Sequence, residues 1–146
     1  MKSHAVNAEQ LDTLADEFAA RLMPKKKKAT VIALFGDLGA GKTAFAKALA
    51  RAYGIEEEVT SPTFVIEKIY APEKGPFKLF IHIDAYRLNG AHDLDVLGWK
   101  ELLQSPGSLI LIEWPEKVAE AIPPDAVRIS LKYVDERTRA ITHDFK

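Results

Sequence analysis

Residues 30–53 read T-V-I-A-L-F-G-D-L-G-A-G-K-T-A-F-A-K-A-L-A-R-A-Y. The stretch opens with the apolar run 31–35, which is rich in strand formers and typical of a buried β-strand. It closes with Ala, Phe and Leu residues that recur three and four positions apart, as on one face of a helix. Between the two, residues 36–43 fit the pattern G-x-x-x-x-G-K-[ST] of a phosphate-binding loop. Together the three parts predict a strand, a phosphate-binding loop and a helix in succession.

The residue types in this loop suit an anionic ligand. Its glycines let the backbone curl so that several N–H groups point at one anion, and the following helix aims the positive end of its dipole at the same place. Lys42 is expected to reach the outer phosphates of a nucleotide from the exposed mouth of the loop, and the Thr43 hydroxyl to hold magnesium. The alternative is a glycine-rich turn without a ligand. The expected nucleotide-binding residues are Asp37, Leu38, Gly39, Ala40, Gly41, Lys42 and Thr43.

Length and composition limit the class of protein. The 146 residues suit a single domain spanning 1–146, and 47% hydrophobic with 28% charged residues is typical of a globular protein with a proper core. No apolar run approaches the roughly 20 residues of a membrane span, and residues 1–9 contain no signal-peptide core. The absence of cysteine excludes disulfides and thiol chemistry and agrees with a cytoplasmic protein. A net charge of −1 argues against direct binding of nucleic acid, so contact with RNA is expected only through a protein partner.

The flanking sequence predicts further elements around this centre. Helices are expected at residues 7–23, where Asn7 and Gln10 can form a capping box, at 92–103 and, in a short form, at 116–122. Hairpins are expected from strands 64–70 with 77–83, and from 127–134 with 139–145. This order predicts a three-layer α/β P-loop fold on a mixed, mainly parallel central sheet with antiparallel hairpin additions. The four lysines at 25–28 are interpreted as a solvated turn, with a patch for an acidic partner as the alternative.

Two acidic residues follow apolar, strand-like runs. The run L-F-I-H-I-D ends in Asp84, which is the form of a Walker B element whose acid reaches magnesium or its waters. Residues 108–112 form a second apolar run, which leads directly into Glu113. Both acids are candidates for one magnesium site, where one ligates the ion and the other holds or deprotonates water. Our hypothesis is that Glu113, which has the longer side chain and ends the more central strand, ligates the metal, and that Asp84 orients the water.

Other side chains flank these acids. His82 is interpreted as a packed strand residue rather than a ligand. Trp114 either stacks over the site as a lid or packs in the core. A loop after the central helix carries hydroxyls that are suited to sensing the outer phosphate, with an ordinary loop as the alternative; these residues are Thr60, Ser61 and Thr63.

Four blocks of sequence resemble a known family when they are taken together. They are G-D-L-G-A-G-K-T at 36–43, S-P-T-F at 61–64, H-I-D-A-Y-R-L at 82–88 and I-E-W-P at 112–115. In this order and at these intervals they closely resemble TsaE, formerly YjeE, the bacterial ATPase of tRNA threonylcarbamoyladenosine synthesis. The resemblance covers about the whole chain. It implies a P-loop ATPase fold, a role in modifying the adenosine next to the anticodon of tRNAs that read codons beginning with A, and docking on the TsaD–TsaB complex.

The same resemblance implies roles for particular residues. Lys42 contacts phosphate, Thr43 and Glu113 ligate magnesium, and Asp84 and Trp114 are active-site residues needed for turnover. ATP and Mg²⁺ are the implied cofactors. The segments at 8–10 and 133–137 match the family only loosely, so the residues that contact adenine stay open.

Three other functions compete with a partner-activated ATPase. A small-molecule kinase is disfavoured by the short chain and by the lack of an arginine-rich lid, since only six arginines occur between Arg21 and Arg139. A GTP-dependent switch is disfavoured because no N-K-x-D or T-K-x-D motif is present to read guanine. A nucleotide-loaded scaffold with incidental hydrolysis is not separated from an ATPase by the sequence. Measuring ATP hydrolysis with and without TsaB–TsaD decides between these two.

Overall fold

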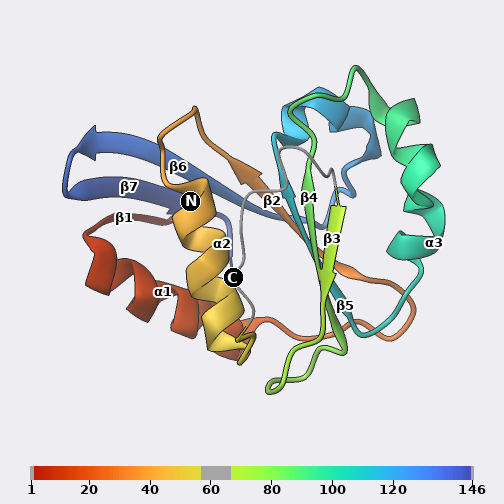
Figure 1. Cartoon of the computed structure of the whole chain (residues 1–146), viewed down its shortest axis with the longest axis horizontal. Helices are drawn as coiled ribbons and strands as arrows, with labels where there is room; N and C mark the ends of the chain where they lie inside the picture. Colours follow the sequence, from red (N-terminus) through yellow and green to blue (C-terminus); the bar gives the residue numbers. More distant parts are fainter. Residues whose placement is uncertain (1, 57–66, 146) are drawn as a thin grey trace.

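The computed structural model describes residues 2–56 and 67–145. A seven-stranded mixed sheet with the strand order β1-β7-β6-β2-β5-β4-β3 runs through the molecule, with helices on both faces (Figure 1). The strands are β1 (Lys2–Val6), β2 (Thr30–Phe35), β3 (Glu67–Tyr70), β4 (Leu79–Asp84), β5 (Ser108–Glu113), β6 (Val127–Asp135) and β7 (Thr138–His143). The helices are α1 (Ala8–Arg21), α2 (Lys42–Ala52) and α3 (Trp99–Leu103), together with the 3₁₀ helices η1 (Ala91–Leu97) and η2 (Pro115–Ala121).

The four central strands, β6, β2, β5 and β4, are parallel, whereas β1, β7 and β3 join them in antiparallel pairs. The predicted fold class is therefore confirmed, including both hairpins, β3–β4 and β6–β7. The register pairs Leu34 of β2 with Glu113 of β5, and Glu113 with Asp84 of β4. Because parallel strands end at one edge of a sheet, this register brings both acids next to the loop that follows β2.

Two hydrophobic cores enclose the sheet and make the three predicted layers. Ile32 and Leu34 of β2 pack in the core shared with α1 and α2, whereas Val31 and Ala33 pack in the core shared with η1, α3 and η2. Successive side chains of a strand point to opposite faces of the sheet, so a strand covered on both faces needs an uninterrupted apolar run. The sequence V-I-A-L of β2 meets this requirement.

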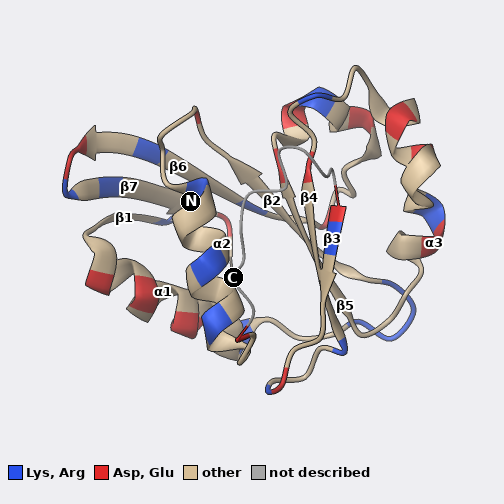
Figure 2. Ribbon diagram, viewed as in Figure 1, with Lys and Arg blue, Asp and Glu red and all other residues tan. Residues whose placement is uncertain are grey.

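The first helix forms as its sequence predicts. Asn7 and Gln10 make the capping box, with the Asn7 side chain accepting from the Gln10 N–H and the Gln10 side chain accepting from the Asn7 N–H, both at 2.9 Å. Figure 2 shows acidic residues along α1 and basic residues along the neighbouring α2, and the acidic residues of α1 are exposed. Asp12 and Arg51 pair across the two helices at 2.5 Å. Both side chains are more than half exposed, so this pair adds little stability compared with the packed apolar faces.

Two elements differ from the prediction. The single helix expected at 92–103 is broken into η1 and α3, because Gly98 adopts a left-handed conformation with φ of 71° and ends one helix before Trp99 begins the next. The strand β1 was not predicted at all. Four of its five residues are exposed, so the strand shows no alternation, and its formation depends on pairing with β7, which lies more than 130 residues away in the chain.

Smaller expectations are refined in the same way. The short helix expected at 116–122 is the 3₁₀ helix η2, whose backbone is irregular at Val118. The lysine run at 25–28 is a turn, and Lys25 and Lys28 both pair with Asp125 at 2.5 and 2.6 Å. The hydroxyl-bearing loop with Thr60, Ser61 and Thr63 lies outside the described residues, as do positions 64–66 of the expected strand.

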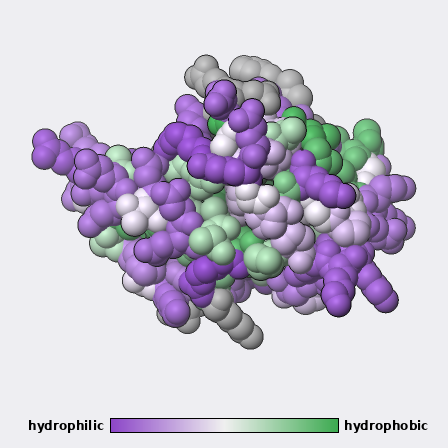
Figure 3. Space-filling model, turned by 90° about the horizontal axis from the view of Figure 1, so that it is seen from below, coloured by the Kyte–Doolittle hydropathy of each residue, from purple (hydrophilic) through white to green (hydrophobic). Residues whose placement is uncertain are grey.

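Surface composition agrees with this layered arrangement. On the face seen in Figure 3 hydrophilic residues predominate, and hydrophobic residues form several separate patches. Within residues 2–56 and 67–145, no helix is long and apolar enough to cross a membrane.

His143, the last residue of β7, is a buried histidine. The Phe145 N–H donates to Nδ1 of His143 at 3.2 Å, so the proton of the neutral ring resides on Nε2, which lies 3.2 Å from Nε2 of His4. Burial lowers the pKa of His143, and the positive charges of Lys2 and Arg21, together with His4, lower it further, while Asp144 opposes them. The folded protein therefore favours the neutral ring.

Acid should weaken the fold through this residue. Below the unfolded pKa of about 6.5, the unfolded chain binds a proton that the folded His143 resists, so stability is lost as the pH falls through that range. Replacing His143→Asn, which keeps an acceptor for the Phe145 N–H, should reduce the fall in Tm between pH 7 and pH 5. The matched control His92→Asn changes a histidine whose side chain is 79% exposed and should leave the pH dependence as it is. An unchanged slope in His143→Asn would contradict this assignment.

Candidate functional site

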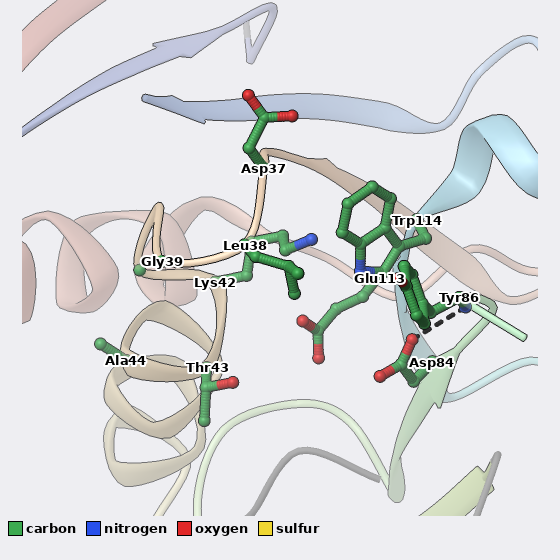
Figure 4. A pocket seen from close by; sticks show the side chains of 11 residues that line it. Asp37, Leu38, Gly39, Lys42, Thr43, Ala44, Asp84, Tyr86, Glu113 and Trp114 are labelled. Atoms are coloured by element: carbon green, nitrogen blue, oxygen red, sulfur yellow. Dashed lines mark hydrogen bonds between the residues drawn. The ribbon is translucent and has the colours of Figure 1, made fainter. Parts of the chain in front are cut away.

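A cavity of about 320 Å³ lies at the carboxyl-terminal edge of β2, β4 and β5 (Figure 4). The loop after β2 and the first turn of α2 form one wall, while the ends of β4 and β5 form the opposite wall. The lining residues are Asp37, Leu38, Gly39, Gly41, Lys42, Thr43, Ala44, Asp84, Tyr86, Glu113 and Trp114. The structure thus brings three separate stretches of sequence together around one space.

Most of the predicted nucleotide-binding residues line this cavity, and Ala40 is the exception. Ala40 is 2% exposed and packs in the core shared with α1 and α2. Its neighbour Leu38 is 76% exposed and overhangs the cavity (Figure 4). The contribution of Ala40 to a ligand is therefore limited to its backbone.

The backbone of the loop at 36–43 allows an anionic ligand to approach it closely. Gly41 has φ of 100° and is the N-cap of α2, where no side chain of the described residues caps the helix. The N–H groups of the first turn are therefore available for an anion at the positive end of the helix dipole. A side chain at Gly36 would place its Cβ 2.9 Å from the Leu131 carbonyl oxygen, so this position accepts only glycine without movement of the backbone.

Lys42 is buried rather than exposed, which corrects the prediction. Its residue is 6% exposed, and Nζ lies 3.5 Å from the centre of the Trp114 ring. Within the described part of the chain, this buried ammonium has no hydrogen-bond partner. Burial lowers the pKa of Lys42, and the carboxylates of Glu113, Glu116, Asp84 and Asp37 partly oppose that shift. The Trp114 ring covers the ammonium group of Lys42.

The two predicted acids meet in the same cavity. Glu113 is 2% exposed and Asp84 is 7% exposed, and both carboxylates face the cavity across from Lys42 and Thr43 (Figure 4). Asp84 Oδ1 accepts a hydrogen bond of 2.9 Å from the Tyr86 N–H, which holds its carboxylate at the turn after β4. Lys42, Thr43, Asp84 and Glu113 therefore line one cavity. That this cavity holds magnesium and phosphate stays a prediction.

His82 is packed as predicted, but it also has a polar partner that the sequence did not reveal. The side chain is fully buried, and its Nε2 lies 2.5 Å from Oε2 of Glu113. His82 and Asp84 point to the same face of β4, because they are two residues apart. A histidine at this position in an otherwise apolar strand was the available signal, although the sequence did not say which residue it would meet.

Trp114 has a strained backbone that aims its ring over the site. Its φ of 56° and ψ of 48° are left-handed, and it is the one non-glycine residue with positive φ in the described ranges. This conformation is unfavourable for a bulky side chain and persists only where the surroundings hold it. The ring packs against Tyr86, with 5.0 Å between the centroids. Trp114 is therefore a cover over Lys42, and Tyr86 is a lining residue that sequence reasoning missed.

A second hollow of about 160 Å³ lies beside the first, on the other side of Gly41 and Ala44. Its wall combines the end of β1, the start of α1 and the β6–β7 turn. The residues involved are Val6, Asn7, Ala8, Leu11, Gly41, Ala44, Glu136, Arg137 and Arg139. Because both hollows share Gly41 and Ala44, they adjoin each other at the start of α2.

The comparison with known families matches almost the whole chain. Residues 6–141 match the family model of the threonylcarbamoyl adenosine biosynthesis protein TsaE. The chain belongs to the TsaE family. TsaE proteins take part in the biosynthesis of threonylcarbamoyladenosine in tRNA, and the resemblance seen in the sequence is confirmed.

Individual TsaE proteins agree along most of their length. This TsaE-family chain is 40% identical over 116 residues to the protein from Treponema pallidum, covering 80% of this chain and 82% of that one. It is 36% identical over 142 residues to the protein from Bacillus subtilis, covering 97% and 84% of the two chains. The crystal structure of Bacillus subtilis YdiB superposes with a TM-score of 0.72 at 32% identity, covering 97% of this chain and 84% of that one.

Proposed function

We propose that this TsaE-family chain binds ATP with Mg²⁺ and hydrolyses it in support of tRNA threonylcarbamoylation. The observation that carries the proposal is the buried ammonium of Lys42, which has no hydrogen-bond partner among the described residues. A buried charge without a partner is costly, and proteins keep such groups mainly where a ligand completes them. Phosphate oxygens are the natural complement, because the start of α2 supplies N–H donors at the same wall.

The residues present also fit a magnesium ion. Thr43 supplies a hydroxyl next to Lys42, and the carboxylates of Glu113 and Asp84 face the same cavity. Mg²⁺ prefers oxygen ligands and is typically bound through one or two carboxylates together with phosphate oxygens and waters. In our proposal Thr43 and Glu113 hold the ion and Asp84 orients the attacking water. The bound ion would neutralise charge that develops on the outer phosphates.

The second hollow is our proposed place for the base of the nucleotide. It adjoins the phosphate wall at Gly41 and Ala44, and Arg137 and Arg139 offer planar guanidinium groups beside it. Arg139 is held in place, since its guanidinium lies 4.7 Å from the Tyr133 ring centre and donates to the Asp135 carbonyl oxygen at 2.6 Å. A planar cation next to an apolar wall suits an aromatic base.

The modification itself is proposed to occur on a partner. The modified base is the adenosine next to the anticodon in tRNAs that read codons beginning with A, and the partner is the TsaD–TsaB complex. A net charge of −1 supports indirect rather than direct contact with tRNA. We place the protein in the cytoplasm with these components.

Nucleotide binding should stabilise the folded chain. A ligand that binds only the native state at about 100 times its dissociation constant adds roughly 2.7 kcal/mol, which corresponds to about 5–10 °C in Tm for a chain of this size. ATP or ADP with Mg²⁺ should give such a shift in a thermal denaturation experiment, and GTP a smaller one. Equal shifts with GTP would remove the assignment of adenine.

The proposed reaction is tested by phosphate release from ATP. The pure protein should hydrolyse ATP slowly, and addition of the TsaB–TsaD complex should accelerate the reaction. A protein that responds to a small metabolite instead would be a kinase. If neither the TsaB–TsaD complex nor a metabolite accelerates phosphate release, the protein is a nucleotide-loaded scaffold and the proposed ATPase is overturned.

A further inference from the structure

His82 of β4 and Glu113 of β5 form a buried polar pair next to the cavity. Nε2 of His82 is 2.5 Å from Oε2 of Glu113, and the two side chains are 0% and 3% exposed. The strands β4 and β5 are parallel neighbours, and the register pairs His82 with Leu111, two residues before Glu113. His82 therefore contacts Glu113 from a position two residues before the strand ends, whereas the cavity is lined by the strand-end residues Asp84 and Glu113.

The direction of this hydrogen bond follows from the chemistry of its partners. A carboxylate only accepts, so the proton must reside on Nε2 of His82. Nδ1 of His82 is buried and has no hydrogen-bond partner within the described ranges. The hydrogen bond is thus assigned as a donation from Nε2 of His82 to Oε2 of Glu113.

We infer that His82 is a positioning residue that fixes the carboxylate of Glu113 for a divalent cation. One oxygen of Glu113 is held by the imidazole, which leaves the other oxygen to face the cavity shared with Thr43. The inference rests on the proposed magnesium site. A glutamate has three side-chain torsions, and their freedom opposes metal binding unless another contact restricts them beforehand. Hydrogen bonds to ligating carboxylates serve this purpose in metal sites, and their loss typically costs 10–100-fold in metal affinity.

Two substitutions separate positioning from simple packing. His82→Leu removes the donor, whereas His82→Gln offers an amide N–H at nearly the same distance from the backbone. The measurement is the Mg²⁺ concentration that gives half of the ADP-induced rise in Tm, which needs no catalytic turnover. We expect His82→Leu to raise this concentration by about 10–100-fold and His82→Gln to return it to within a few-fold of the parent. ADP binding in excess chelator should be similar in all three proteins. His92→Leu, at an exposed histidine, is the matched control.

A measurement on the unsubstituted protein guards against misfolding of the variants. In a ¹⁵N–¹H correlation spectrum, His82 should show a protonated Nε2, and its signal should shift when Mg²⁺ is added with ADP. An Nε2 without a proton overturns the inference, as does an unchanged Mg²⁺ requirement in a folded His82→Leu protein. If the parent itself shows no Mg²⁺-dependent ADP binding, the proposed function fails first. If the parent shows Mg²⁺-dependent ADP binding and His82→Leu needs no more Mg²⁺ than the parent, the proposed function stands and the role of His82 fails.

Discussion

Replacing Lys42→Met should abolish ATP hydrolysis and weaken nucleotide binding by about 10- to 100-fold, while the nucleotide-free protein stays folded. The lost contact is a charge-assisted hydrogen bond to phosphate, worth about 1.5–3 kcal/mol in the ground state. Hydrolysis suffers more than binding, because the same charge also stabilises the transition state. Phosphate release with the TsaB–TsaD complex and binding by calorimetry measure the two effects.

The stability of the free protein makes this prediction specific. The ammonium of Lys42 is buried over Trp114 and has no hydrogen-bond partner in the described residues, so its desolvation works against the folded state. Methionine keeps most of the apolar stem and removes the charge. The Tm of the nucleotide-free variant should therefore be unchanged or higher.

A matched control uses the same helix. Lys47→Met changes a half-buried lysine of α2 that does not line the cavity, and it should leave nucleotide binding and turnover near the parental values. Near-normal hydrolysis by Lys42→Met in the presence of the partner complex would refute the phosphate-binding role of the loop. A large loss of Tm in the free protein would instead assign Lys42 to the fold.

The two acids should fail in different ways when they are neutralised. Glu113→Gln should raise the Mg²⁺ concentration needed for nucleotide binding, because our hypothesis makes this carboxylate the direct ligand. Asp84→Asn should bind ATP with Mg²⁺ nearly as well as the parent but lose turnover by about 10²–10⁴-fold, the range typical of a lost proton-handling group. Each amide can still accept the hydrogen bond that the structure shows, from His82 in one case and from the Tyr86 N–H in the other.

Titration of Mg²⁺ against nucleotide binding in both variants decides the division of roles. Glu116→Gln is the control for general loss of negative charge, because Glu116 acts on Lys42 electrostatically without lining the cavity. If Asp84→Asn shows the Mg²⁺ defect and Glu113→Gln does not, the roles are reversed and Asp84 is an ordinary Walker B ligand. If Glu116→Gln behaves like either variant, the effect is one of overall charge.

Much of the site was accessible from the sequence because its parts are local. The loop at 36–43 is continuous, so its glycines, Lys42 and Thr43 were recognisable from spacing alone. Asp84 and Glu113 were recognisable because each follows an apolar strand, and parallel strands end at one edge of a sheet. The break at Gly98 within the expected helix was not predicted, because an isolated glycine is tolerated in many helices and does not by itself indicate a helix end.

Sequence alone determined the order of strand, loop and helix, the two strand-end acids and the family, since these depend on neighbouring residues or on motifs in a fixed order. Only the tertiary structure decided that Trp114 covers Lys42, that His82 holds Glu113 and that β1 pairs with β7. These contacts join residues that are 31 to more than 130 positions apart. Their formation depends on sheet register and on which face each side chain takes, and both follow from the packing of the whole chain rather than from any local pattern.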